Sequence, residues 1–177
     1  MRIFDEIART PISILTEGNN VRYLELACQL RDIDDVDIVS GLEGVTGKDQ
    51  LKTLFDFFSR AEHKNKVLFV FDCDVKQQFQ ERNSTFAYVF PENPDNKITK
   101  RGIENAFQES LFDGLVTTIQ PADGEERREF DRKCKGRLEQ RILSRRNVDD
   151  FDFFDGLFAK LDSIRGLPET DESGAKT

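Results

Sequence analysis

The chain has 177 residues, 34 of them acidic and 26 basic, and a formal net charge of −8. This length suits one compact domain that buries a sizeable core without disulfides or structural metals. No apolar run approaches the roughly 18–20 residues of a membrane span, and the acidic N-terminus lacks the apolar core of a signal peptide. The three cysteines are widely spaced, which excludes a CxxC zinc ribbon and favours a reducing, cytoplasmic setting.

Short apolar runs alternate with segments of helical period over the first two-thirds of the chain. The runs predict strands at 12–15, 36–39, 67–71, 86–90 and, for a short one, 115–119. Apolar residues at helical spacing predict helices over 20–31, 49–61 and 102–110.

The runs at 67–71 and 86–90 are almost continuously apolar. Such strands are typical of a parallel sheet that is covered on both faces. Alternation of strand and helix at this spacing predicts an α/β fold, with an open, mostly parallel sheet of four or five strands flanked by helices.

The last third of the chain is expected to form a C-terminal helical extension. One long helix is predicted over 125–146, and Asp149 or Asp150 can cap a final helix with an apolar face that extends to Ile164. We therefore expect an α/β domain at 1–122, helices packed on it at 123–167 and a frayed tail at 168–177.

Carboxylates follow several of the predicted strands. Glu17 follows the first strand, Asp72 and Asp74 follow the third, and Glu104 lies in the helix-like segment after the fourth. Parallel strands present their carboxyl ends at one sheet edge, where ligands bind. With His63 as the single histidine, an all-oxygen cluster of this kind suits Mg²⁺ or Mn²⁺; the alternative is that each acid is a solvated loop end.

Two other motifs fail on inspection. The segment Gly41 to Asp49 resembles a phosphate-binding loop, but its spacing is one residue too long and Asp49 stands where Ser or Thr would hold magnesium. Asp72-x-Asp74 could begin a calcium loop, but Lys76 and Gln77 stand where an oxygen ligand and a glycine are needed.

The order of the motifs resembles the TOPRIM domain of topoisomerases, bacterial primases and several nucleases. Glu-Gly closes the first strand in SILTEGNN, Asp-x-Asp closes the third in VLFVFDCD, and a glycine-rich turn follows the second. The stretch PENPDNKITKRGIENAF and a later lysine-bearing helix are similar to the TOPRIM of OLD-family (overcoming lysogenization defect) nucleases and related phage-defence proteins. The resemblance covers about residues 10 to 165 and implies a Rossmann-like TOPRIM fold.

The resemblance implies a Mg²⁺- or Mn²⁺-dependent endonuclease that hydrolyses nucleic-acid phosphodiester bonds. Asp72 and Asp74 would bind the metal, Glu17 would be a ligand or general base, and Glu104 would complete a second site. Lys135, or Lys133 two residues earlier, would stabilise charge in the transition state.

Two departures from the family pattern bear on this reading. Family members often carry an acid shortly after Glu-Gly, where this chain has Asn19-Asn20-Val21. OLD nucleases carry an ATPase domain upstream that this chain lacks. It would therefore act alone, with a separate ATPase subunit or as a detached domain, and a homo-oligomer is a further alternative.

The basic residues predict a contact with nucleic acid, DNA in the first instance. Residues 125–146 hold nine Arg and Lys against five acids, and Lys133, Arg137, Arg141 and Arg145 recur every four residues. Such a helix beside a metal site could follow a phosphate backbone. The alternative is an amphipathic helix with ordinary ion pairs.

Two other functions remain open. A phosphotransferase of the haloacid-dehalogenase type would use Asp72 as nucleophile, but Lys76 replaces the usual Thr or Val and Glu17 has no role. A catalytically weak TOPRIM-like module would instead bind and regulate a partner ATPase or nuclease.

Overall fold

The computed structural model describes residues 12–18, 20–39, 47–119 and 127–167. Its main sheet has four parallel strands in the order β2-β1-β3-β4. The strands are β1 (Ile12–Thr16), β2 (Val36–Val39), β3 (Lys66–Phe71) and β4 (Thr85–Val89). The expected open, parallel α/β sheet is thereby confirmed, and β1 and β3 are its two central strands.

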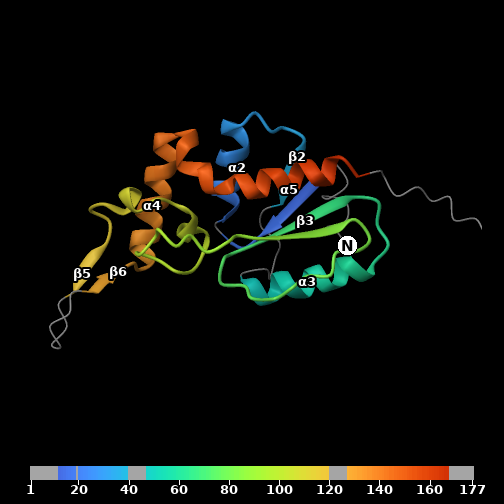
Figure 1. Cartoon of the computed structure of the whole chain (residues 1–177), viewed down its shortest axis with the longest axis horizontal. Coiled ribbons are helices and arrows are strands. Elements are labelled where there is room, and N and C mark those ends of the chain that lie inside the picture. The colour runs from blue at the N-terminus through green and yellow to red at the C-terminus, as the bar shows by residue number, and fades with distance from the viewer. Residues whose placement is uncertain (1–11, 19, 40–46, 120–126, 168–177) are drawn as a thin grey trace, which may run out of the picture.

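Helices cover both faces of this sheet (Figure 1). Helix α3 (Lys48–Arg60) lies on one face, while α2 (Asn20–Leu30) and α5 (Asp155–Arg165) lie on the other. Every residue of β1 is buried, as are five of the six residues of β3. Coverage of both faces explains why residues 67–71 of β3 are an unbroken apolar run.

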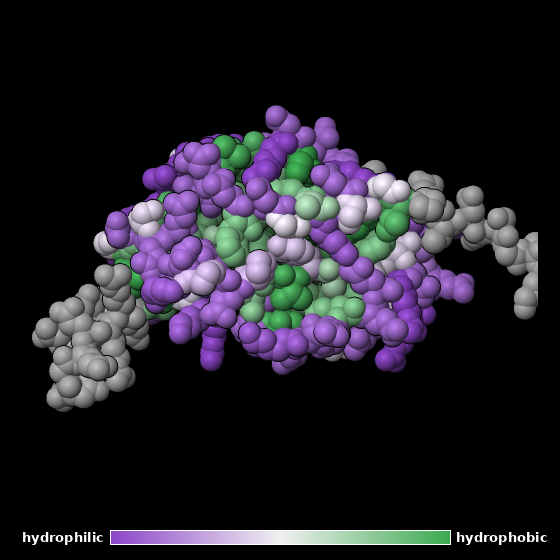
Figure 2. Space-filling view, viewed as in Figure 1, coloured by the Kyte–Doolittle hydropathy of each residue, from purple (hydrophilic) through white to green (hydrophobic). Residues whose placement is uncertain are grey.

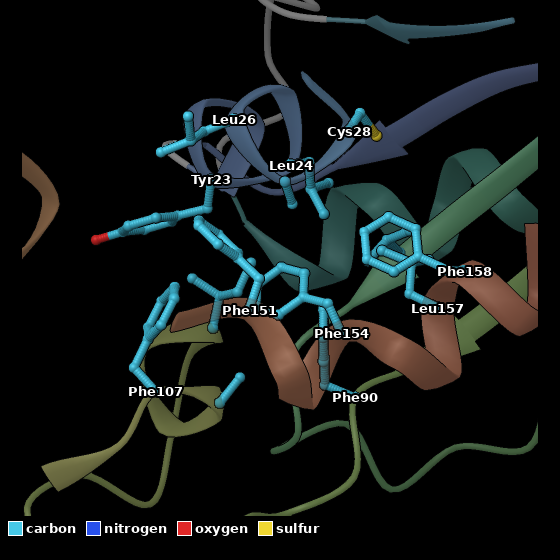
Figure 3. Close-up of a cluster of buried hydrophobic side chains, with 14 of the residues drawn as sticks. Tyr23, Leu24, Leu26, Cys28, Phe90, Phe107, Phe151, Phe154, Leu157 and Phe158 are labelled. Carbon is cyan, nitrogen blue, oxygen red and sulfur yellow. The ribbon is translucent and has the colours of Figure 1, made fainter. Parts of the chain in front are cut away.

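The two faces of the sheet have separate cores. On the α3 face, Leu51, Phe55 and Phe58 pack against alternate residues of β3, Val67, Phe69 and Phe71. On the opposite face, Leu68 and Val70 meet a larger cluster from α2, α5 and the segments before them. Figure 3 shows the aromatic centre of this larger core, which includes Phe90, Phe107, Phe151 and Phe154.

The C-terminal elements belong to the larger core. Helix α4 (Arg132–Arg145) contributes Leu138 and Ile142, and the 3-10 helix η3 (Val148–Phe154) precedes α5. The prediction of helices packed on the α/β sheet agrees with these contacts. The predicted boundary at 122/123 and the tail at 168–177 lie outside the described residues, so the division into domains stays a prediction.

The long helix expected over 125–146 is shorter than predicted. Helix α4 begins at Arg132, because Asp131 has an extended backbone and its side chain accepts a hydrogen bond from the Cys134 amide. This is an N-cap, which ends a helix on its N-terminal side. Before it, β6 (Arg127–Glu129) pairs antiparallel with β5 (Thr117–Ile119). The strand predicted at 115–119 therefore forms, but in a separate two-stranded sheet.

The helix predicted over 102–110 is replaced by two 3-10 turns, η1 (Ile103–Ala106) and η2 (Glu109–Phe112). Gly102 before η1 has φ +75° and ψ 172°, a conformation open essentially to glycine alone. Asn96, nearly fully buried, donates to the main-chain oxygens of Glu104, Asn105 and Phe107. In a regular helix these carbonyls would accept main-chain hydrogen bonds. Here they accept from Asn96, and the segment forms a loop held by that side chain, which we call the stapled loop.

The surface is mostly polar, and no described helix is long and apolar enough to cross a membrane. Figure 2 shows a face dominated by hydrophilic side chains, with hydrophobic ones in small separate areas. Among the described residues, the large hydrophobic side chains that are exposed are Phe57, Val148 and Leu167.

Candidate functional site

The carboxyl ends of the two central strands bring Glu17 and Asp72 together. Strands β1 and β3 pair in parallel, with Thr16 opposite Val70. Glu17 follows Thr16 directly, and Asp72 lies two residues beyond Val70. The sequence-based expectation that acids gather at this edge depends on this pairing, which the structure shows.

A cavity of about 450 Å³ opens at this edge. It lies between the strand ends, the start of α2, the η1 segment and α4. Its lining is mainly polar and charged and consists of Glu17, Gly18, Asn20, Tyr23, Asp72, Glu104, Arg132, Lys135, Gly136 and Glu139. Of the predicted site residues, Glu17, Asp72, Glu104 and Lys135 therefore share one cavity.

Asp72 is the most buried acid of the predicted motif, with 9% of its surface exposed. Its Oδ1 accepts a hydrogen bond of 2.8 Å from Asn20 Nδ2. Burial raises the pKa of Asp72 to about 7, and the negative charge of Glu17 adds to this increase, while the bond from Asn20 opposes it. A carboxyl group in this state gains strongly from a nearby cation.

Glu17 has an unsatisfied oxygen. Its Oε1 is buried and has no hydrogen-bond partner in the described part of the chain. Burial raises the pKa of Glu17, and the charge of Asp74 raises it further. A buried, unpaired carboxylate oxygen is costly, so this atom calls for a donor or cation beyond those that the described residues supply.

Asp74 has different surroundings from Asp72. Its Oδ2 accepts a hydrogen bond of 2.8 Å from Lys48 Nζ, at the first residue of α3. Asp74 is not part of the cavity lining. The two aspartates of the motif therefore contact different partners, one on each side of the sheet edge.

Glu104 reaches the cavity from the stapled loop, and 7% of its surface is exposed. Lys135 Nζ of α4 donates to Glu104 Oε2 over 3.1 Å. A Cβ atom at Gly102 would lie 2.3 Å from the same oxygen, which is closer than real atoms approach. Gly102 thus keeps open the space that the Glu104 carboxylate occupies.

Helix α4 turns one of its faces to the cavity. Arg132, Lys135 and Glu139 lie at i, i+3 and i+7 and all line it, as the helical period requires. Glu139 also pairs with Arg22 of α2 over 2.6 Å.

The predicted nucleic-acid contacts lie elsewhere on α4. Lys133 is exposed and does not line the cavity. Arg137 donates to the Leu115 carbonyl over 2.8 Å, and Arg141 donates to the carbonyls of Leu111 and Asp113. Arg145 pairs with Asp150. These three arginines tie α4 to its neighbours, and a role for any of the four residues in binding nucleic acid stays a prediction.

Tyr23 contributes a hydroxyl to the cavity. Its ring packs 5.1 Å from the ring of Phe107, and Figure 3 shows its oxygen at the outer edge of the apolar cluster. Burial raises the pKa of Tyr23 well above its usual range, and the charges of Glu104 and Glu139 add to this. The hydroxyl therefore stays protonated and is available as a hydrogen-bond donor.

Sequence reasoning did not assign a role to Tyr23, Arg132 or Glu139, and treated Asn20 only as a missing acid. A signal for two of them was present, because Asn20 and Tyr23 are three residues apart on one helix that starts beside Glu17. The cavity face of α4 could not be chosen from sequence, since basic residues lie on several of its faces.

The donor set is suited to a hard divalent cation, although the side chains do not form a finished metal site. Among the residues that the structure describes, no three His, Cys, Asp or Glu side chains are grouped so that they could hold a metal ion. Mg²⁺ commonly uses one or two protein carboxylates and keeps several waters. Glu17 and Asp72, with an unpaired buried oxygen and mutual repulsion, fit that smaller requirement.

Comparison with known proteins adds no family. Searches with the chain found no matching family model, curated protein or solved structure. The likeness to TOPRIM domains therefore stays a prediction from the motifs.

Proposed function

We propose that this protein is a metal-dependent nuclease that hydrolyses phosphodiester bonds at the cavity between β1, β3 and α4. One observation carries the proposal. Glu17 and Asp72 come from neighbouring strand ends and share a cavity, where burial raises the pKa of both and the charge of Glu17 raises that of Asp72 further. Perturbed carboxyl groups in a cavity are typical of functional sites.

Glu17 and Asp72 are the residues that would hold Mg²⁺ or Mn²⁺. When bound there, such an ion polarises a phosphate oxygen and makes water more acidic. Asn20 keeps Asp72 in a fixed orientation through its 2.8 Å hydrogen bond. TOPRIM domains often carry an acid near this position; here Asn20 supplies an amide that orients Asp72.

The opposite wall of the cavity supplies positive charge for a phosphate group. Lys135 and Arg132 lie there on one face of α4, and the pairing of Lys135 with Glu104 holds its ammonium group at the cavity. Cations placed where negative charge develops stabilise the transition state of phosphoryl transfer. The protonated hydroxyl of Tyr23 is a further donor at the same wall.

The likeness to TOPRIM nucleases supports nucleic acid as the substrate. Acids at the sheet edge would hold the metal ion, and cations on α4 would neutralise the negative charge of a phosphodiester bound in the cavity. The net charge of −8 opposes tight nonspecific binding to nucleic acid. We therefore expect binding to be weak at physiological salt and to depend on a few cavity residues. The likeness to OLD nucleases also supports a role in cytoplasmic defence against phage.

The direct test is cleavage of supercoiled plasmid by the purified chain, with Mn²⁺, with Mg²⁺ and with EDTA. We expect nicking that depends on the metal and falls at least about 100-fold in Asp72→Asn. Asp56→Asn, the same chemical change at an exposed position of α3, should leave the rate unchanged. A single-stranded RNA of the same length, run in parallel, distinguishes the two substrates. Cleavage that survives Asp72→Asn and Glu17→Gln would refute the proposal.

A second function is favoured by the internal partners of these acids. Asp72 is held by Asn20, Asp74 by Lys48 and Glu104 by Lys135. A cluster satisfied in this way could serve as a rigid module that binds and regulates a separate ATPase or nuclease. Calorimetry that detects no Mn²⁺ binding, together with a stable complex with a partner in pull-down experiments, would support this function over the first.

A further inference from the structure

The α3 side of the sheet edge contains a built-in cation. Lys48 Nζ lies 2.8 Å from Asp74 Oδ2. The Asp74 side chain is 26% exposed and that of Lys48 is 42% exposed, so the pair is partly shielded from water. Pairs of this kind keep more of their Coulomb attraction than fully exposed ones.

This cation also acts on the cavity. The acids at this edge act on one another: the charge of Asp74 raises the pKa of Glu17, and the charges of Glu17 and Asp74 both raise the pKa of Asp72. Lys48 interacts with Glu17 as well as with its direct partner Asp74. Lys48 therefore offsets negative charge at the edge of the proposed metal site; Lys52 also acts on Glu17, but Lys48 is the lysine hydrogen-bonded to Asp74.

We propose that Lys48 is a permanent counter-ion of Asp74 that takes the place of a second divalent cation, so that the site binds one metal ion, at Glu17 and Asp72. This inference rests on the proposed function, because it concerns how many ions the same acids accept. Lys48 is then a residue that determines metal stoichiometry, and Asp74 is not a metal ligand in the native chain.

The charges of the cluster support a single ion. Glu17, Asp72, Asp74 and Glu104 carry four negative charges when ionised, and the two lysines bonded to Asp74 and Glu104 carry two positive charges. The remaining two negative charges equal the charge of one divalent cation. A second ion would make the cluster positive overall.

Geometry leads to the same conclusion. A cation at Asp74 would have to displace the Lys48 ammonium or lie within a few ångströms of it, where the like charges repel. The amide of Asn20 points its Nδ2 donor at Asp72, so this side chain supplies a hydrogen-bond donor rather than an anionic ligand for a second ion.

The test is the number of Mn²⁺ ions bound per chain, measured by isothermal titration calorimetry. We expect one ion for the native chain and two for Lys48→Met, which removes the charge and keeps most of the apolar stem. Lys52→Met is the matched control, because Lys52 lies one turn later on α3 and pairs at 3.9 Å with Asp49 rather than Asp74. It should still bind one ion.

Asp74→Asn completes the design without altering Lys48. In the native background it should change the Mn²⁺ dissociation constant less than about threefold, and in the Lys48→Met background it should return the stoichiometry from two to one. Circular dichroism confirms that each variant is folded.

The outcomes separate this inference from the function on which it rests. Two ions bound by the native chain, a tenfold or greater loss of affinity in Asp74→Asn alone, or a single ion in Lys48→Met would each overturn the inference and leave the nuclease proposal standing. No Mn²⁺ binding by the native chain would overturn both.

Discussion

The two faces of the sheet differ in chemistry at its carboxyl edge. On the face covered by α2 and α5, Asp72 is buried beside Asn20 and Glu17 and borders a cavity with cations on its far wall. On the face covered by α3, Asp74 is partly exposed and paired with Lys48. Residues two apart in sequence thus contact different partners on opposite sides of the same edge.

This difference shows that the two aspartates of a short motif can lie in different surroundings at the edge of a sheet. Alternate residues of a strand point to opposite faces, and Asp72 continues the series of Leu68 and Val70, which face the larger core. Asp74 lies beyond the strand end, where the chain turns toward α3. Two acids in an Asp-x-Asp motif therefore need not converge, even though the spacing allows it.

The largest expected effect comes from the apolar support of the cavity face. Phe107 is fully buried, and its ring contacts those of Tyr23, Phe151 and Phe154. Phe107→Ala should lower the free energy of unfolding by about 3–5 kcal/mol and loosen the loop that carries Glu104. Phe55→Ala, on the α3 face, should have a similar cost because Phe55 is 2% exposed.

Urea denaturation and Mn²⁺ titration under native conditions distinguish the two phenylalanine variants. We expect the folded fraction of Phe55→Ala to keep native metal affinity and that of Phe107→Ala to lose at least about fivefold. Equal metal affinities in the two variants would show that the cavity does not depend on the core of its own face.

The second largest effect is an increase in the free energy of unfolding in Asp72→Asn. The folded pKa of this group is about 7 against an ordinary value of 3.8, so ionisation is disfavoured in the folded state. Both states are protonated only well below the ordinary pKa of 3.8, and the folded state loses relative stability as pH rises from there to about 7. Asp72→Asn removes this penalty and should stabilise the protein by about 2–4 kcal/mol at pH 8 in EDTA.

Urea denaturation at pH 5 and pH 8 checks the direction in which this gain in stability changes with pH. The gain from Asp72→Asn should be larger at pH 8, whereas Asp56→Asn, which is exposed, should show no such trend. Mn²⁺ should raise the melting temperature of the native chain and not that of Asp72→Asn. A gain that is equal at the two pH values would mean that the group is ionised at both.

A smaller effect is expected at Gly102, where two consequences can be separated. Gly102 and Gly114 have φ values of +75° and +70°, so alanine at either position should cost about 1–3 kcal/mol in backbone strain. Only at Gly102 would the new Cβ meet the Glu104 carboxylate. Plasmid cleavage should therefore fall about tenfold in Gly102→Ala and remain native in Gly114→Ala, and equal rates would remove Glu104 from the functional site.

The smallest expected effect compares two faces of α4. Arg132→Ala, at the cavity, should weaken binding of a short DNA duplex two- to fivefold and reduce its salt dependence by the equivalent of about one phosphate contact. Arg137→Ala should mainly lower stability, because Arg137 bonds the Leu115 carbonyl. Fluorescence anisotropy at several salt concentrations measures DNA binding by both variants, and urea denaturation measures their stability. If Arg137→Ala weakened DNA binding and Arg132→Ala did not, the basic residues predicted from their spacing would be the DNA contacts.

Much of the fold was predictable because its signals are local. The apolar runs of β1 and β3 identify central strands of a parallel sheet, and a parallel sheet places Glu17 and Asp72 at one edge. The stripe of α3, with Leu51, Phe55 and Phe58 buried, was equally clear. In each case hydrophobic period and the geometry of parallel strands suffice.

Other features depended on contacts between distant segments. The helix expected at 102–110 is a loop because Asn96 bonds its carbonyls, and the start of α4 at Arg132 depends on the side-chain cap from Asp131. No periodic pattern in the sequence indicates which face of α4 lines the cavity. Nor does one indicate that Asp72 and Asp74 have separate partners. Amino-acid order alone determined which strands form and which acids end them, since these follow from local hydrophobicity; only tertiary packing decided which of those acids share a cavity, since side-chain partners are set by elements far apart in the chain.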